Sequence, residues 1–283
     1  MRYDIAILGS GPAGLSAAIN AKVRNKNIIV FGNSNLSDKI VKAPKVDNYL
    51  GIYDTTGENL KEMFKSHIDK MGIEITEERI NNVYAMGEYF ALMVNEKTYE
   101  ATTVILATGI EYAKPIKGEE EFLGRGVGYC ATCDAALYRG KKVVIVGYND
   151  EAEEEANFVM EIASNVYYIP MYKGEYKLAD GIEVIKDVPI EVLGDMKANK
   201  LILRNSEIDV DGIFFIRNSI SPKYLVPGLE VEGGHIKVDR SMRTNIKGCF
   251  ASGDCIGKPY QYIKAAGEGQ VAALNAVSYI DKK

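Results

Sequence analysis

The chain has 283 residues, of which 47% are hydrophobic and 26% are charged, and its formal net charge is −5. This composition is typical of a globular protein, and the length allows two domains of about 100–200 residues each. The negative charge argues against nucleic acid or an anionic membrane as a partner. No segment approaches the roughly 18 apolar residues of a membrane span, and the first apolar run, Ile5–Leu8, is too short for a signal peptide. Four cysteines are too few for a disulfide scaffold, so we expect a cytoplasmic protein.

The N-terminal segment has a strand–turn–helix pattern. Residues 3–8, which end in the apolar run Ile5–Leu8, predict a buried strand, and a helix rich in small residues follows to about Arg24. Between them lies the Gly-x-Gly-x-x-Gly turn of residues 9–14. In such a turn the first glycine permits a tight bend, the second lets backbone approach a pyrophosphate and the third lets the helix pack closely. The pattern therefore predicts a dinucleotide at the N-terminus of this helix.

The next elements continue this α/β pattern as far as residue 117. A second apolar strand over residues 27–31 ends at Asn33, where an acidic residue for a ribose hydroxyl is usual; an amide can still bind such a hydroxyl. An amphipathic helix is predicted from Gly57 to about Met71, and His67 on it is interpreted as a solvated surface residue. Short strands fill residues 73–106, and residues 111–117 are predicted to be a linker.

A Cys-x-x-Cys pair, Cys130 and Cys133, follows the linker. The two intervening residues keep both sulfurs on one turn, close enough to bond, but zinc sites use the same spacing. A zinc site would need two more ligands, and Cys249 and Cys255 are six residues apart in another motif, so we expect them to be buried. Asp134 is the only local candidate for an acid–base group, because neither histidine is nearby in sequence.

Five motifs occur in a characteristic order. They are the glycine turn, Asn48-Tyr49-Leu50-Gly51, Ala107-Thr108-Gly109, Cys130-Ala131-Thr132-Cys133-Asp134 and Gly248-Cys249-Phe250-Ala251-Ser252-Gly253-Asp254. With these motifs the chain resembles the low-molecular-weight thioredoxin reductase family from end to end. The resemblance implies an α/β fold with two Rossmann-like (three-layer ββα) nucleotide-binding domains, and a homodimer. It implies a discontinuous FAD-binding domain of residues 1–112 and 241–283, with a dithiol-bearing domain, residues 113–240, inserted.

The resemblance also implies roles for individual residues. Cys130 is expected to attack the disulfide of thioredoxin, Cys133 to face the flavin and Asp134 to move protons. Asp254 is expected to bind the ribityl hydroxyls of FAD, and the helix that begins near Tyr262 to point backbone N–H groups at the flavin ring. No metal site is predicted. The complete set of predicted FAD-binding residues is Gly9, Ser10, Gly11, Pro12, Ala13, Gly14, Asn33, Asn48, Ala107, Thr108, Gly109, Gly253, Asp254, Tyr262 and Ile263.

The second nucleotide turn departs from the family pattern Gly-Gly-Gly-Asp-Ser/Thr-Ala. Here residues 147–152 read Gly-Tyr-Asn-Asp-Glu-Ala, and the side chain of Asn149 would occupy the place of a phosphate. The acidic residues 150, 151 and 153–155 would repel a pyrophosphate, or they form a solvated helix face. Where the family has a His-Arg-Arg segment for NADPH, residues 170–174 offer only Lys173, a poor substitute for bidentate arginines. The degenerate site resembles that of the ferredoxin-dependent flavin thioredoxin reductases.

The predicted function is the reduction of thioredoxin by ferredoxin through FAD. A ferredoxin near −400 mV and a thioredoxin near −270 mV make the transfer of two electrons downhill by about 6 kcal/mol. Two alternatives stay open from the sequence. One is an FAD-dependent dithiol oxidase that passes electrons to oxygen, and the other is a flavin redox-sensing protein without turnover.

Overall fold

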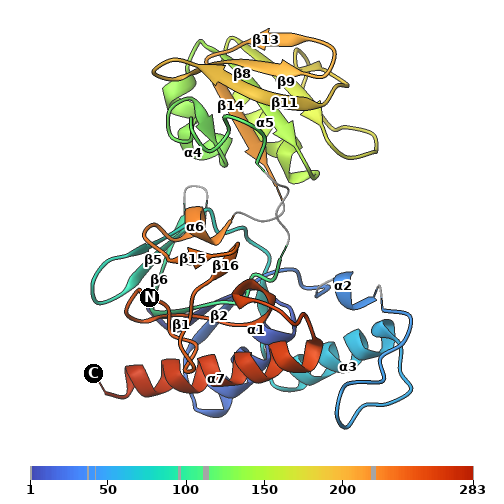
Figure 1. The fold of residues 1–283 in the computed structure, drawn as a ribbon, viewed down its shortest axis with the longest axis vertical. Helices are drawn as coiled ribbons and strands as arrows, with labels where there is room; N and C mark the ends of the chain where they lie inside the picture. The colour runs from blue at the N-terminus through green and yellow to red at the C-terminus, as the bar shows by residue number, and fades with distance from the viewer. Residues whose placement is uncertain are drawn as a thin grey trace. The chain divides into compact units, whose positions relative to one another are not determined.

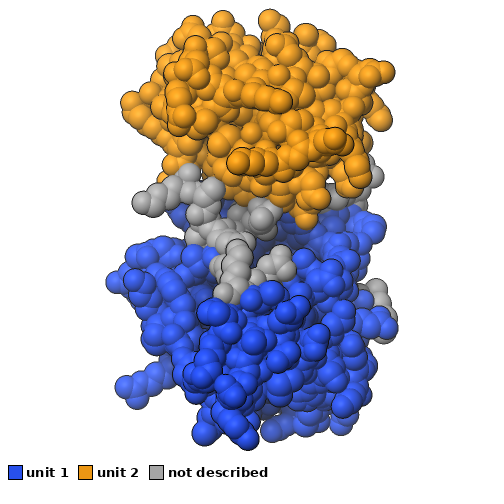
Figure 2. All heavy atoms as spheres, turned by 90° about the vertical axis from the view of Figure 1, so that its right-hand side faces the viewer, with its two compact units in different colours: residues 1–110, 221–283 blue, residues 111–220 orange. Residues whose placement is uncertain are grey.

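The computed structural model describes residues 2–36, 38–41, 43–94, 97–110, 115–217 and 221–282, and these form two compact units (Figure 2). Unit 1 comprises Met1–Ile110 and Ser221–Lys283, and unit 2 comprises Glu111–Ile220. Unit 1 is therefore discontinuous, with unit 2 inserted. The second boundary differs from the predicted residue 240. Residues 221–240 belong to unit 1 because Asn82 Nδ2 donates to the carbonyl of Tyr224 (3.3 Å) and the N–H of Glu230 donates to Asn245 Oδ1 (3.0 Å).

Unit 1 is built on a seven-stranded sheet in which β3, β2, β1, β6, β5 and β4 follow one another and β17 also pairs with β6 (Figure 1). Strands β1, β2, β3, β6 and β17 are parallel, whereas β4 and β5 form an antiparallel extension. The elements before unit 2 are β1 (Arg2–Leu8), α1 (Pro12–Val23), β2 (Ile28–Phe31), α2 (Asp38–Val41), α3 (Gly57–Lys70), β3 (Ile75–Thr76), β4 (Asn82–Ala85), β5 (Phe90–Val94) and β6 (Lys97–Leu106). Those after it are α6 (Pro222–Leu225), β15 (Val231–Glu232), β16 (His235–Ile236), β17 (Cys249–Ala251), the 3-10 helix η2 (Gly253–Ile256) and α7 (Tyr262–Ile280).

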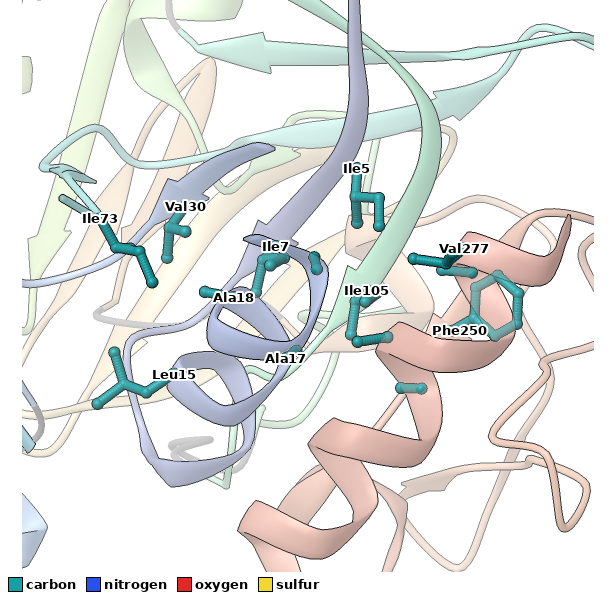
Figure 3. Close-up of a cluster of buried hydrophobic side chains, with 14 of the residues drawn as sticks. Ile5, Ile7, Leu15, Ala17, Ala18, Val30, Ile73, Ile105, Phe250 and Val277 are labelled. Carbon is teal, nitrogen blue, oxygen red and sulfur yellow. The ribbon is translucent and has the colours of Figure 1, made fainter. Parts of the chain in front are cut away.

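The core of unit 1 lies between β1 and two helices, α1 and α7 (Figure 3). Ile5 and Ile7 project from one face of β1 and are fully buried, as the alternation of side chains along a strand requires. The helices meet over small residues. A Cβ added to Gly269 of α7 would lie 2.0 Å from the carbonyl oxygen of Ala13 in α1, so glycine is needed for this close contact.

Unit 2 has three layers. A five-stranded parallel sheet of order β10-β9-β8-β14-β7 lies between α5 and a three-stranded antiparallel sheet of order β11-β12-β13. Along β8, Val143 and Ile145 pack with α5, while Val144 and Val146 pack with the second sheet, which explains why the whole strand is apolar. The elements are β7 (Val127–Gly128), α4 (Ala131–Asp134), the 3-10 helix η1 (Ala135–Tyr138), β8 (Lys142–Gly147), α5 (Glu151–Met160), β9 (Asn165–Pro170), β10 (Glu183–Val184), β11 (Pro189–Gly194), β12 (Ala198–Leu203), β13 (Glu207–Asp209) and β14 (Gly212–Ile216).

The predicted α/β fold with two Rossmann-like domains is confirmed by these two sheets. Helices α1, α3 and α7 end within about two residues of their predicted ends. Among the described helices, none combines the length and the apolar character needed to cross a membrane. Within the described residues, no three His, Cys, Asp or Glu side chains are grouped so that they could hold a metal ion. Part of the predicted linker, residues 111–114, lies outside the described residues.

Candidate active site

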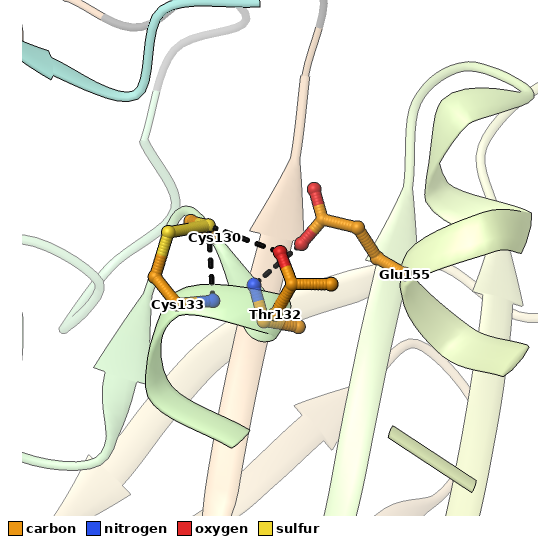
Figure 4. Close-up of a disulfide and its surroundings, with 5 residues drawn as sticks. Cys130, Thr132, Cys133 and Glu155 are labelled. Atoms are coloured by element: carbon orange, nitrogen blue, oxygen red, sulfur yellow. Dashed lines mark hydrogen bonds between the residues drawn. A yellow bond between two sulfur atoms is a disulfide. The ribbon is translucent and has the colours of Figure 1, made fainter. Parts of the chain in front are cut away.

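The dithiol lies at the start of α4, directly after β7. Cys130 and Cys133 form a disulfide with an S–S distance of 2.05 Å and a Cα–Cα distance of 5.4 Å (Figure 4). Cys130 is 8% exposed, whereas Cys133 is exposed. The N–H of Cys133 donates to Cys130 Sγ at 3.2 Å, and Thr132 Oγ1 lies 3.4 Å from the same sulfur. After reduction these donors would stabilise negative charge on Cys130, the residue that is predicted to attack the disulfide of thioredoxin.

Asp134 is the last residue of α4 and follows Cys133 directly. It lies over the backbone of β7, since a Cβ added to Gly128 would be 3.3 Å from Asp134 Oδ2. Burial raises the pKa of the Asp134 carboxyl above its ordinary value. A carboxyl with a raised pKa exchanges protons closer to neutral pH, which fits the predicted role as the acid–base group of the dithiol.

Glu155 also contacts the dithiol turn, and the sequence did not single it out. Its Oε2 accepts a hydrogen bond from the N–H of Ala131 at 2.5 Å (Figure 4). The two residues are 24 positions apart, so neither a helical nor a strand period connects them. The interpretation of the acidic helix face as simply solvated is therefore wrong for this residue.

The predicted nucleotide turn of unit 1 lies at the carboxyl ends of β1, β2 and β6. Gly9 has a φ of +122°, and a Cβ added to it would lie 2.1 Å from the carbonyl oxygen of Ala107, so the turn needs glycine there. Ser10 Oγ donates to the carbonyl of Asn33 at 2.9 Å and accepts the N–H of Asn33 at 3.0 Å. A Cβ added to Gly253 would lie 2.9 Å from the Cβ of Ala13. The structure thus brings together the glycine turn, residue 33, residues 107–109 and η2.

The residues of this region fit the pyrophosphate of a dinucleotide. Gly11 has an ordinary φ of −81°, and a Cβ added to it would meet no atom of the chain within 4 Å. It therefore faces open space, which a ligand held against the backbone would use. The first N–H groups of α1 have no partner within the helix and favour an anion. Ser252 Oγ is buried and has no hydrogen-bond partner in the described part of the chain, so a ligand hydroxyl could satisfy it.

The remaining predicted FAD-binding residues lie around the start of α7. Asn48 Nδ2 donates to Gln261 Oε1 at 2.7 Å, an interaction that the sequence did not predict. Burial, and then the charge of Asp254, raise the pKa of Tyr262, which places Asp254 near the first residue of α7. Ile263 is 38% exposed. The contacts of these side chains with FAD stay predictions.

Comparisons with known proteins identify the family. The model of the pyridine nucleotide-disulphide oxidoreductase family matches residues 3–269. The chain belongs to this family. A ferredoxin-flavin thioredoxin reductase from Clostridium acetobutylicum has 62% sequence identity and a TM-score of 0.95, over 100% of this chain and 99% of that chain. The atypical thioredoxin reductase TRi from Desulfovibrio vulgaris Hildenborough has 29% identity and a TM-score of 0.76, over 100% and 99% of the chains. The thioredoxin reductase of Treponema pallidum is 33% identical over 99% of this chain and 97% of its own length.

The second nucleotide turn of this pyridine nucleotide-disulphide oxidoreductase, residues 147–152, is surrounded by side chains of the chain itself. Glu153 in the first turn of α5 is only 6% exposed; it accepts the N–H of Lys177 at 2.7 Å and a hydrogen bond from the hydroxyl of Tyr172. The Tyr172 hydroxyl lies 2.9 Å from that of Tyr168. Burial and the bond to Glu153 raise the pKa of Tyr172, and burial raises the pKa of Tyr168 to about 12. Glu153 is therefore a buried structural acid, which excludes the interpretation as a solvated face for this residue.

An ion pair occupies the other side of the same turn. Arg217, the residue after β14, donates from Nη1 and Nη2 to the two carboxylate oxygens of Glu119, at 2.5 and 2.8 Å. The side chains are 9% and 0% exposed. The guanidinium also stacks over the ring of Tyr148, 4.8 Å from its centroid. Tyr148 stands where the family pattern has a glycine, so Arg217 packs against the turn itself.

Proposed function

We propose that the chain is an FAD-dependent disulfide reductase that reduces thioredoxin with electrons from ferredoxin. The observation that carries the proposal is the occupied second turn. Glu153 with Tyr172 on one side and Arg217 with Tyr148 on the other use the region where an NADPH-dependent relative would bind its donor. The name of the Clostridium acetobutylicum relative, a ferredoxin-flavin thioredoxin reductase, supports the same donor.

Charge gives the physical reason why a nicotinamide dinucleotide fits poorly here. A pyrophosphate at the N-terminus of α5 would lie near the carboxylate of Glu153, which is only 6% exposed, so solvent screens its charge weakly. Arg217 could attract phosphate, but its guanidinium is already engaged by both oxygens of Glu119. Releasing it would leave Glu119 buried and unpaired, which costs about 3–5 kcal/mol.

In unit 1, residues 9–14 with Asn33, residues 107–109, Gly253 and Asp254 would hold FAD. When bound, FAD supplies the conversion between single electrons from ferredoxin and the electron pair that reduces the disulfide. The dithiol then reduces thioredoxin. The thiolate of Cys130 attacks one sulfur of the thioredoxin disulfide, that S–S bond breaks, and Cys133 attacks Cys130 and releases the second thioredoxin thiolate. Asp134 removes the proton of the attacking thiol and returns one to the leaving thiolate.

One anaerobic assay tests the donor. Purified FAD-loaded protein is mixed with thioredoxin and with NADPH, NADH or chemically reduced ferredoxin, and the appearance of thioredoxin thiols is followed. We expect turnover with reduced ferredoxin and less than about 1% of that rate with either nicotinamide, which corresponds to a difference of about 2.7 kcal/mol in transition-state stabilisation. Rapid turnover with NADPH and none with ferredoxin would contradict the proposal.

The same preparation separates the alternative functions. Consumption of oxygen with small dithiols, without any reduction of thioredoxin, would identify a dithiol oxidase. Full FAD content without turnover for any donor would identify a redox-sensing protein. We further propose a cytoplasmic homodimer, for which light scattering of the purified protein should give twice the chain mass of 31.2 kDa.

A further inference from the structure

Glu155 lies outside the dithiol turn but contacts it directly. The carboxylate extends from α5 toward the start of α4, and its Oε2 accepts the N–H of Ala131 at 2.5 Å (Figure 4). Ala131 follows Cys130 in the chain. The contact therefore fixes the backbone of the turn at the residue next to one of the two reactive sulfurs.

The backbone donors of the turn are divided between two acceptors. The N–H of Cys133 points to Cys130 Sγ at 3.2 Å, whereas the N–H of Ala131 points to Glu155. The donor of Ala131 is therefore not available to a thiolate on Cys130. The carboxylate also adds a negative charge at the residue next to Cys130, and negative charges near one another repel. Both effects disfavour the thiolate and hence the reduced dithiol.

We propose that Glu155 is a positioning residue that orients the dithiol turn and keeps the dithiol strongly reducing. The inference rests on the proposed function, because a strong reductant is what the reduction of thioredoxin requires. A dithiol whose reduced form is destabilised gives up its electron pair more readily, just as one whose reduced form is stabilised becomes an oxidant. The residue acts through the backbone N–H of Ala131.

The test compares two matched variants. Glu155→Gln keeps a side-chain oxygen that can accept the N–H of Ala131 and removes the charge. Glu154→Gln removes the same charge from the neighbouring residue, which is exposed. Each FAD-loaded protein is equilibrated anaerobically at pH 8 with mixtures of reduced and oxidised dithiothreitol. In this exchange the Cys130–Cys133 bond breaks, the ring disulfide of dithiothreitol forms, and two electrons and two protons pass to the enzyme. Alkylation and mass spectrometry give the reduced fraction.

We expect Glu155→Gln to shift the equilibrium toward the reduced enzyme by about threefold to tenfold, and Glu154→Gln to shift it by less than twofold. A tenfold shift corresponds to about 30 mV in the reduction potential. Glu155→Ala should show at least the same shift and a lower kcat for thioredoxin, because the turn also loses its anchor. A shift for Glu155→Gln no larger than that for Glu154→Gln would overturn the inference.

The measurement keeps this inference separate from the proposed function. Dithiothreitol needs neither ferredoxin nor thioredoxin, so the equilibrium shift can be measured whatever the physiological donor is. If the shift is present but reduced ferredoxin does not support turnover, the proposed donor is wrong and the role of Glu155 stands. If turnover with ferredoxin is normal but the shift is absent, the proposed donor stands and the role of Glu155 is wrong.

Discussion

At the scale of single residues, Asp134 combines a cost in stability with a chemical role. Burial raises the pKa of its carboxyl, so the folded protein disfavours the charged form. A group whose pKa is higher in the folded than in the unfolded protein stabilises the fold while it is protonated. This contribution is fully present at a pH below its pKa in the unfolded protein, and it is lost as the pH rises through its pKa in the folded protein. Ionisation of the Asp134 carboxyl as the pH rises therefore costs the folded protein stability that a neutral side chain at this site would not lose.

Asp134→Asn should separate stability from activity. We expect the variant to unfold at a higher temperature than the native protein at pH 7, and the difference to shrink as the pH falls toward 4. Thioredoxin reduction should fall by about a hundredfold or more, because the amide cannot exchange protons with the thiols. Thermal unfolding at several pH values and steady-state assays measure both effects. Asp180→Asn, at an exposed turn position, is the control. A variant that is less stable at pH 7, or one that keeps full activity, would contradict the assignment.

At the scale of elements, Gly11 and Gly14 of the glycine turn at the start of α1 are needed for different reasons. A Cβ added to Gly14 would lie 1.8 Å from the carbonyl oxygen of Gly9, so this position is fixed by packing within the chain. A Cβ added to Gly11 would meet nothing within 4 Å. We infer that the fold requires Gly14, whereas the ligand requires Gly11.

Two alanine variants test this division. Gly14→Ala should destabilise the apoprotein by about 1–3 kcal/mol, the usual range for overpacking. Gly11→Ala should leave the unfolding of the apoprotein unchanged but weaken FAD binding at least about tenfold, since the new methyl group would stand where the pyrophosphate approaches. Denaturant unfolding and FAD titration of the apoprotein provide the two measurements. If the FAD affinity of Gly11→Ala were unaltered, this turn would not be part of the FAD-binding site.

The sequence predicted β1, α1 and the glycine turn well because the residue patterns that identify them are local. The apolar run of β1, the glycine spacing and the small residues of α1 lie within about 25 consecutive residues. Contacts between distant segments left no such signal. Glu155 meets Ala131 across 24 residues, and Asn48 meets Gln261 across 213, through side chains that suit a solvated surface equally well. For the same reason the sequence did not show that residues 221–240 pack with unit 1.

At the scale of the whole molecule, the chain passes between its two units twice, after residue 110 and after residue 220. Glu119 and Arg217 stand close in sequence to these two passages, and their ion pair joins the first and last parts of unit 2. Glu119 also accepts the N–H of Ile116 at 3.0 Å, which fixes the entering segment. The pair therefore holds together the first and last described segments of unit 2.

Removing one partner of the Glu119–Arg217 ion pair should destabilise unit 2 and leave the stability of unit 1 unchanged. Arg217→Met leaves Glu119 buried without its cation, and we expect a loss of about 3–5 kcal/mol in the stability of unit 2. The double variant Glu119→Leu with Arg217→Met should recover most of this loss, because no uncompensated charge remains. Native-state hydrogen exchange followed by mass spectrometry resolves the two units, since peptides of residues 115–217 report on unit 2 and peptides of β1, α1 and α7 on unit 1. Equal protection of unit 2 in the native and Arg217→Met proteins, or a double variant as unstable as the single one, would show that the pair does not hold unit 2 together.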